Sequence, residues 1–206
     1  MRSDRPFQTL LILFTILLAL PGSGLAKSAQ VDQPAPMFRL PDANGKVHTL
    51  KDYLGKRVVL EWVNFDCPFV KKHYDSGNMQ KLQTEYTAKE VVWLSICSSA
   101  KGKQGQFPPE KIRALLAEKK AAPTAYLIDV TGGVGEAYGA KTTPHMFIID
   151  AEGKLTYAGA IDDKPTTDVN DIPKAKNFVR AVLDDLLAGK APALKSATPY
   201  GCAVKY

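Results

Sequence analysis

Cys67 is the residue best placed for chemistry, because it lies between a predicted strand and a predicted helix. Residues 58–63 are apolar and rich in β-branched side chains, which predicts a buried strand. Pro68 suits the first position of a helix, where its missing N–H group would have no partner. A helix N-terminus favours a thiolate, as does Lys71 one turn on, whereas a nearby Asp66 carboxylate would oppose it. We therefore expect redox or nucleophilic chemistry at Cys67, with a small buried apolar side chain as the alternative.

Two further cysteines could pair with Cys67. Cys202 lies beside Gly201 in a tail that we expect to be flexible, so it could attack an oxidised Cys67 and form a disulfide. A permanent bridge is the alternative; it would close a loop of well over a hundred residues and contribute about 4–5 kcal/mol in the chain-entropy model. Cys97 ends a second apolar segment at the same predicted sheet edge, so it is another candidate for resolving the disulfide or, alternatively, a buried strand cysteine.

The pattern of elements around these cysteines predicts an α/β fold. The alternation of strands and helices implies right-handed parallel crossovers, and the last two strands form an antiparallel hairpin. We expect a mixed central sheet with helices on both faces. The predicted strands are 58–63, 91–96, 125–130, 146–150 and 155–160, the helices are 68–88, 109–120 and 175–187, short helical turns are 50–54 and 132–138, and an N-terminal hairpin turns at 44–45.

The first residues have the pattern of a signal peptide. Arg2 and Arg5 precede an apolar run at 10–20, which is too short to span a bilayer comfortably. Small residues then lead to an expected cleavage after Ala26, with a retained anchor as the alternative. We expect an exported protein, periplasmic or secreted, with no stable membrane span after cleavage. The predicted organisation is a signal peptide at 1–26, one domain at 27–188 and a C-terminal tail at 189–206.

Charge and cysteine count exclude two classes of protein. The formal net charge is +6, but the lysines are scattered along the sequence, so we do not expect nucleic-acid binding. Three cysteines are too few for a disulfide scaffold, and an odd number leaves at least one thiol unpaired in an oxidising compartment.

Several segments carry a family resemblance. Residues 35–46 look like the N-terminal hairpin of redoxins, residues 50–56 look like the turn that follows it, and residues 142–150 match the thioredoxin element Thr-Pro-x-x-x-(Ile/Val)-Asp. With a cysteine at the first crossover, residues 34–188 resemble the thioredoxin superfamily, in its redoxin branch of alkyl hydroperoxide reductases and thiol-specific antioxidants. The resemblance implies a thioredoxin-like three-layer sandwich. It also implies that Pro144 is cis beside Cys67 and that Thr143 presents its backbone to a bound thiol partner.

The chain departs from both well-known redox motifs of this superfamily. Val70 stands where thioredoxins have the second cysteine of Cys-x-x-Cys, so a dithiol within one helical turn is impossible. Peroxiredoxins carry Pro-x-x-x-Thr-x-x-Cys, and here Leu60 and Asn64 occupy the proline and threonine positions. The hydroxyl that orients a peroxide oxygen in that family is thus replaced by an amide.

The leading hypothesis is an exported thiol-based oxidoreductase without a cofactor. Cys67 attacks a peroxide, or a protein or small-molecule disulfide; Cys202, or else Cys97, resolves the product, and a thiol reductant restores the enzyme. One alternative is a copper- or metal-binding module on the same fold with Cys67, His145 and Cys202 as ligands, since thiolates and imidazole suit Cu(I). Another is a catalytically silent redoxin with a structural Cys67–Cys202 disulfide.

We expect two further pairs of polar residues to have structural rather than catalytic roles. Asp162-Asp163 follows the last predicted strand and is expected to cap a loop or helix, with a cation site as the alternative. Lys72 and His73 are expected to line the first helix, with His73 outside direct reach of Cys67.

Overall fold

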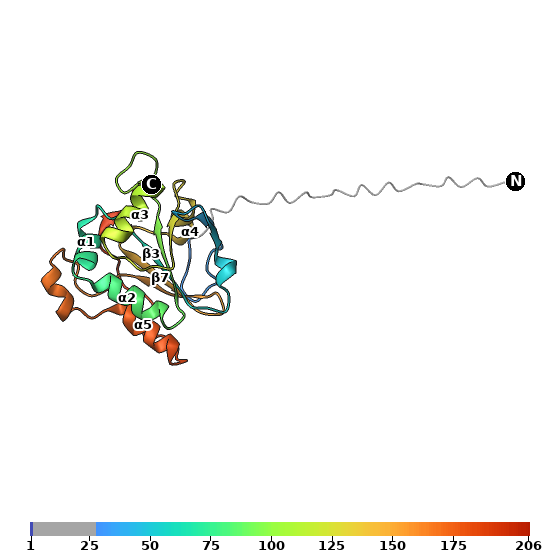
Figure 1. Cartoon of the computed structure of the whole chain (residues 1–206). Coiled ribbons are helices and arrows are strands. Elements are labelled where there is room, and N and C mark those ends of the chain that lie inside the picture. Colours follow the sequence, from blue (N-terminus) through green and yellow to red (C-terminus); the bar gives the residue numbers. More distant parts are fainter. Residues whose placement is uncertain (2–27) are drawn as a thin grey trace.

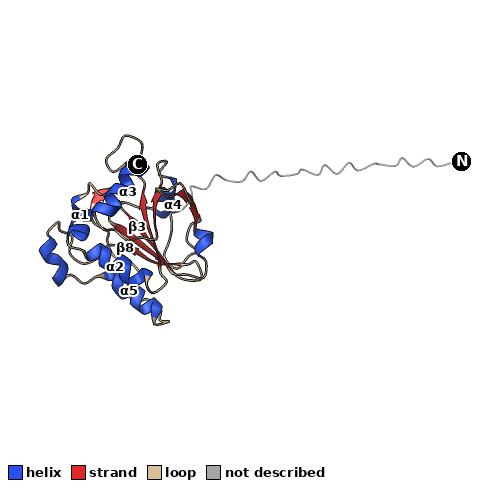
Figure 2. Ribbon diagram, viewed as in Figure 1, coloured by secondary structure: helices blue, strands red, loops and turns tan. Residues whose placement is uncertain are grey.

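A five-stranded mixed sheet forms the centre of the protein (Figures 1 and 2). The computed structural model describes Met1 and residues 28–206, so the predicted signal peptide lies outside the described residues apart from Met1. The strand order is β5-β4-β3-β7-β8, and the strands are β3 (Val58–Trp62), β4 (Val92–Cys97), β5 (Ala125–Ile128), β7 (His145–Ile149) and β8 (Leu155–Gly159).

The pairing of these strands follows from their connections. β3, β4 and β5 run parallel to one another, because helices join them. β7 pairs antiparallel with both β3 and β8, as the predicted hairpin requires. All five residues of β3 are buried, which explains why its sequence is apolar on both faces rather than alternating. The predicted α/β sandwich with a mixed sheet is confirmed.

Two apolar layers cover the two faces of the sheet. One face packs against α1 (Pro68–Asp75), α2 (Asn78–Thr87), α3 (Pro109–Glu118) and α5 (Phe178–Leu187). The other face packs against the hairpin of β1 (Arg39–Pro41) and β2 (Val47–Thr49), the 3₁₀ helix η1 (Leu50–Tyr53) and α4 (Gly133–Tyr138). Trp93 belongs to the first layer and Trp62 to the second, and both are fully buried. Helices therefore lie on both faces of the sheet, in three layers.

The predicted single helix over 68–88 is wrong, because it is two helices. α1 ends at Asp75 and α2 begins at Asn78. Gly77 between them has a φ of +74°, a left-handed conformation that breaks a right-handed helix and that glycine adopts without strain. The break lets α2 take its own direction across the sheet.

Three elements in the C-terminal half were not predicted from the sequence. The 3₁₀ helix η2 (Val169–Lys174) precedes α5, which begins three residues later than predicted. A second small sheet pairs β6 (Thr142–Thr143) with β9 (Cys202–Ala203). The tail beyond 189 is therefore held against the domain instead of extending from it.

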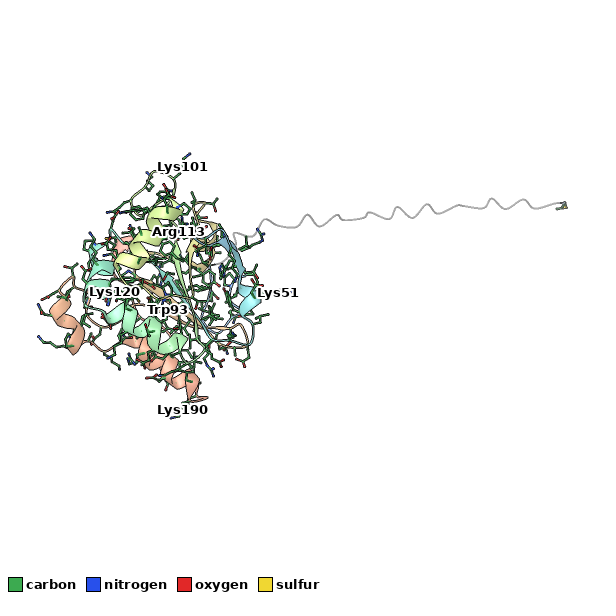
Figure 3. All side chains as sticks on the ribbon, viewed as in Figure 1. Lys51, Trp93, Lys101, Arg113, Lys120 and Lys190 are labelled. Atoms are coloured by element: carbon green, nitrogen blue, oxygen red, sulfur yellow. The ribbon has the colours of Figure 1, made fainter. Side chains whose placement is uncertain are left out.

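The surface carries lysines on several sides. Lys51, Lys101 and Lys190 lie at separate edges of the view (Figure 3), whereas Trp93 is fully buried. Within the described part of the chain, no helix combines the length and the apolar composition needed to cross a bilayer.

The packing of α5 on the sheet predicts a large loss of stability on truncation. Leu183 on α5 is fully buried, so Leu183→Ala should lower the free energy of unfolding by about 2–5 kcal/mol. Leu54→Ala removes the same atoms from a side chain that is 50% exposed, and should cost less than about 1 kcal/mol. Urea denaturation of both variants checks this; equal losses would contradict the assigned core.

Candidate functional site

Cys67 lies at the N-terminus of α1, as predicted, and its side chain is fully buried. It is the N-cap residue of the helix, with Pro68 at the first helical position. Its backbone N–H group donates to the carbonyl of Asn64 at 2.9 Å, which closes the turn between β3 and α1. Its Sγ donates to the carbonyl oxygen of Thr143 at 3.0 Å. The sulfur thus faces a segment 76 positions away in the sequence.

The bend at Thr143 and Pro144 lies directly against this sulfur. The peptide bond between them is cis, as the resemblance implied. Thr143 belongs to β6, and its register partner in β9 is Cys202. The same two-residue pairing therefore brings the second cysteine beside the first. All three cysteines of the chain are free thiols in this structure.

Gly201 lets the tail come this close. Its φ is +136°, and a Cβ atom there would lie 2.1 Å from the carbonyl oxygen of Thr143. Any side chain would push the tail away from β6. In this structure Gly201 serves the close packing of the tail, and the flexibility expected of the tail stays a prediction.

The electrostatics of the pair favour a thiolate on Cys67. Burial opposes ionisation, but the Cys67 thiolate would accept hydrogen bonds from the Cys202 thiol, the Thr143 side chain and the N–H groups of Cys202 and Val70. These outweigh burial, so the pKa of Cys67 is lowered. The Val70 N–H belongs to the first turn of α1, so the helix N-terminus contributes as predicted. Burial and the adjacent Cys67 sulfur raise the pKa of Cys202 to about 11. The first sulfur of the pair to ionise is that of Cys67.

The hydroxyl of Thr143 is available to the thiolate. Within the described residues this Oγ1 is buried and has no hydrogen-bond partner while Cys67 is protonated. A buried hydroxyl without a partner is costly, and a thiolate on Cys67 would accept a hydrogen bond from it. The Thr143 backbone therefore holds the thiol and its side chain favours the ionised form.

Cys97 lies apart from this pair. Its Sγ donates to the carbonyl oxygen of Gly105 at 3.3 Å, and its sulfur also neighbours the buried ring of Tyr126. Cys97 does end β4 at the same sheet edge, as predicted, but its contacts are with the 100–107 loop.

His145 also lies apart from Cys67, on the opposite face of the sheet. Its ring packs on Phe147 at a centroid distance of 4.3 Å, and its Nδ1 accepts from the N–H of Lys141 at 3.2 Å. Burial and the charge of Lys141 lower its pKa to about 4, so the ring is neutral. Among the residues that the structure describes, no three His, Cys, Asp or Glu side chains form a metal-ligand group. The Cys67–His145–Cys202 ligand set is therefore not assembled.

The two residues that depart from the peroxiredoxin motif, Leu60 and Asn64, both have structural roles. Leu60 is buried in the layer on the far side of the sheet. The side chain of Asn64 accepts from the N–H of Asp66 at 2.9 Å and donates to the carbonyl of Gln104 at 3.4 Å. The Asn64 amide thus holds two loops together and is not directed at the Cys67 sulfur.

Sequence reasoning missed a fully buried carboxyl on β3. Glu61 accepts hydrogen bonds from the Tyr74 hydroxyl at 3.0 Å, the Gln83 amide at 3.1 Å, the Trp93 indole at 2.8 Å and the Ser95 hydroxyl at 2.9 Å. Burial raises its pKa in spite of these four donors. The available signal was a charged residue in the middle of an apolar strand.

The sequence also gave no reason to connect His73 with the tail. His73 is buried on α1, outside contact with Cys67 as expected, and it bonds instead to Tyr200, two residues before Cys202. Asp162 caps the loop after β8 by accepting from the N–H of Lys164 at 2.9 Å, and it also binds Tyr200.

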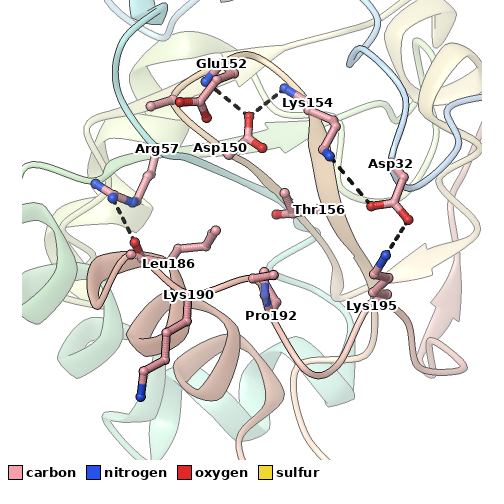
Figure 4. Close-up of a pocket in the computed structure, with 13 residues that line it drawn as sticks. Asp32, Arg57, Asp150, Glu152, Lys154, Thr156, Leu186, Lys190, Pro192 and Lys195 are labelled. Carbon is pink, nitrogen blue, oxygen red and sulfur yellow. Dashed lines mark hydrogen bonds and ion pairs between the residues drawn. The ribbon is translucent and has the colours of Figure 1, made fainter.

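A pocket of about 390 Å³ lies at the opposite edge of the sheet (Figure 4). Its wall includes Arg57 just before β3 and Asp150 just after β7, whereas Cys67 follows the other end of β3. The charged groups drawn there largely satisfy one another: Lys154 and Lys195 both face Asp32, and Arg57 donates to the Leu186 carbonyl (Figure 4). This pocket is separate from the cysteine pair.

Comparisons with known proteins agree with this geometry. The model of the AhpC/TSA family matches residues 31–158. A hypothetical protein from Sinorhizobium meliloti 1021 is similar in structure, with a TM-score of 0.73, 26% identity and coverage of 87% of this chain and 96% of that one. An uncharacterised conserved protein from Geobacillus kaustophilus has a TM-score of 0.73 and 29% identity, over 86% and 92% of the two chains.

A third similar structure carries a functional description. It is a Chlorobium tepidum protein provisionally described as a thiol:disulfide interchange protein, DsbE, with a TM-score of 0.52, 26% identity and coverage of 64% of this chain and 85% of that one. No curated protein matches the sequence.

The hydrogen bond from the Cys202 thiol predicts a shift in the ionisation of Cys67. Cys202→Ala removes this donor and should raise the pKa of Cys67, whereas Cys202→Ser keeps an O–H donor and should leave the pKa lowered. The ultraviolet absorbance of the thiolate, followed against pH in the reduced proteins, checks this. Identical titrations of the two variants would contradict the assigned hydrogen bond.

Proposed function

This chain belongs to the AhpC/TSA family, and we propose that it is a thiol–disulfide oxidoreductase with Cys67 as nucleophile and Cys202 as resolving cysteine. The pairing of Thr143 with Cys202 beside the Cys67 sulfur is the observation that supports these roles. Family membership agrees with the thiol-dependent chemistry expected from the sequence. The roles of the two sulfurs follow from their pKa values, which favour attack by Cys67.

The reaction consumes one disulfide and produces two thiols. The Cys67 thiolate attacks a sulfur of the substrate disulfide; a mixed disulfide forms and one substrate thiolate leaves with the electron pair of the broken bond. Cys202 then loses its proton and attacks the Cys67 sulfur, which releases the second substrate thiol and closes the Cys67–Cys202 disulfide. The substrate gains two electrons and the protein loses two. A thiol reductant returns both cysteines to the reduced state.

Exchange with a disulfide is favoured over reduction of a peroxide. Peroxide reduction in this family uses a hydroxyl where this chain has Asn64, and the Asn64 amide is engaged with Asp66 and Gln104. The Chlorobium tepidum protein that resembles this chain is described as acting in disulfide interchange. The buried Thr143 carbonyl, by contrast, is placed beside the sulfur that a disulfide partner would join.

Export is part of the proposal. The pattern of charged, apolar and small residues before position 27 is typical of a signal peptide. Outside the cytoplasm, protein disulfides are common substrates and disulfide exchange persists. A periplasmic or secreted location would therefore supply both the substrate class and the need for a reductant partner.

Replacing Cys67 and replacing Cys202 should block different steps of the reaction. Cys67→Ser should abolish reduction of glutathione disulfide, with a loss of at least about 10³-fold, because Cys202, the sulfur that remains at this site, has a raised pKa and is rarely ionised. Cys202→Ser should still release one equivalent of glutathione and then stop as a mixed disulfide. Intact-protein mass spectrometry checks both results.

Cys97→Ser is the matched control, since Cys97 bonds to Gly105 away from the pair. It should retain the wild-type rate of glutathione release. The same three variants assayed with hydrogen peroxide separate the two chemistries. A Cys67–Cys202 disulfide that resists excess thiol, with no turnover of either oxidant, would establish a structural bridge and refute the enzyme.

A further inference from the structure

A C-terminal strap, residues 198–206, covers the cysteine pair. Cys67 is fully buried, while Cys202 on the strap is half-buried. The middle of the strap is β9, which pairs with β6. After β9 the strap is held by hydrogen bonds from Ala100 N–H to the Lys205 carbonyl at 2.8 Å and from the Tyr206 hydroxyl to the Ala140 carbonyl at 2.8 Å. A substrate can reach the Cys67 sulfur only if this cover moves.

Tyr200 holds the other end of the strap, two residues before Cys202. Its hydroxyl donates to Asp162 Oδ1 at 2.5 Å. That hydroxyl has a single proton, so the contact at 3.2 Å to His73 Nε2 must be a bond that His73 donates. His73 Nδ1 then accepts from the amide of Asn78 at 3.0 Å, which completes a consistent set of donors and acceptors. One phenol oxygen thus connects the strap to α1 and to the loop after β8.

The charges around Tyr200 keep this arrangement in one protonation state. Burial and the positive charge of Lys72 lower the pKa of His73 to about 3, so its ring is neutral. The closest approach of His73 to Asp162 Oδ2 is 4.0 Å, which is too long for a hydrogen bond. Lys72, itself buried, donates to the Lys164 carbonyl at 2.7 Å and lies 5.9 Å from the centre of the Tyr200 ring.

The ring of Tyr200 also contacts the segment that carries Cys67. Phe69, two residues after Cys67, packs on it at a centroid distance of 5.8 Å. The residue two positions after one cysteine therefore packs against the residue two positions before the other. The hydroxyl and the ring of Tyr200 together hold the backbone before Cys202 against the start of α1.

We propose that Tyr200 is a positioning residue that latches the strap over the cysteine pair. With the latch closed, Cys202 is held against Cys67 and the intramolecular disulfide forms quickly, while outside reagents are excluded. With the latch open, Cys67 is accessible but Cys202 is no longer held in place. Tyr200 thereby sets the balance between substrate entry and resolution. This inference rests on the proposed function of the Cys67–Cys202 pair.

Tyr200→Phe tests the latch because it keeps the ring on Phe69 and removes only the hydroxyl. Two rates should change in opposite directions. Closure of the Cys67–Cys202 disulfide from the glutathione mixed disulfide should slow by about tenfold, the equivalent of one hydrogen bond to a charged group, and the mixed disulfide should accumulate. Alkylation of Cys67 by a maleimide in the reduced protein should become faster by about the same factor.

Both rates are measured by quenched mass spectrometry with peptide mapping, which reads each cysteine separately. Cys97 is an internal control, because it is buried against Gly105 away from the strap and its alkylation should not change. Tyr86→Phe is the matched control variant. Tyr86 is a buried tyrosine whose hydroxyl also donates to an aspartate, Asp184 Oδ1 at 2.7 Å, on the α2–α5 side of the fold.

The outcomes separate the latch from the proposed function. Slower closure with faster alkylation of Cys67 in Tyr200→Phe alone supports the latch. Unchanged rates in Tyr200→Phe, in a protein whose wild type closes the disulfide, refute the latch and leave the function standing. Equal effects in Tyr86→Phe, or faster alkylation of Cys97, assign the change to general loosening and also refute it. A wild type that never forms the Cys67–Cys202 disulfide refutes the function itself.

Discussion

The pairing of β6 with β9 is the contact on which the chemistry of this protein depends. It joins only two residues from each side, Thr142–Thr143 and Cys202–Ala203, yet it brings together a helix N-terminus, a cis-proline bend and a second sulfur. The rest of the fold makes this short pairing possible. β3 delivers Cys67 and β7 begins just after Pro144, and these two strands are direct neighbours in the sheet. The strap contributes only the short strand β9, which pairs with β6.

A single residue, Thr143, contributes in two ways to the ionisation of Cys67. The Thr143 carbonyl accepts from the Cys67 thiol, and its buried hydroxyl favours the thiolate. The helix that begins at Cys67 supplies the Val70 N–H group, and Cys202 supplies both its thiol and its N–H. These donors act at short range inside the protein, where burial alone would have kept the sulfur protonated. A second cysteine in the first turn of α1 is therefore unnecessary, and Val70 can pack in the core instead.

The sequence was sufficient to predict the sheet, its mixed pairing and the position of Cys67, because each depends on local patterns. Apolar strands, Pro68 at a helix start and the Thr143-Pro144 element are readable without coordinates. The break at Gly77 was missed because the apolar pattern continues through it. The close packing of Gly201 was missed because its approach to a carbonyl far away in the sequence leaves no local pattern. Glu61 and the His73–Tyr200–Asp162 contacts escaped for the same reason: their partners are far apart in the chain.

The long separation of the two cysteines has a consequence for biogenesis. Cys202 follows Cys67 by well over a hundred positions, and Cys97 lies between them. As the chain is synthesised from its N-terminus, both Cys67 and Cys97 are made well before the strap exists to cover either the sulfur or the bend at Thr143. During that interval the reactive thiol has only the wrong partner available within its own chain. In the folded protein the hydrogen bond from Cys97 to the Gly105 carbonyl holds this sulfur against the 100–107 loop, so the completed fold favours the pairing of Cys67 with Cys202.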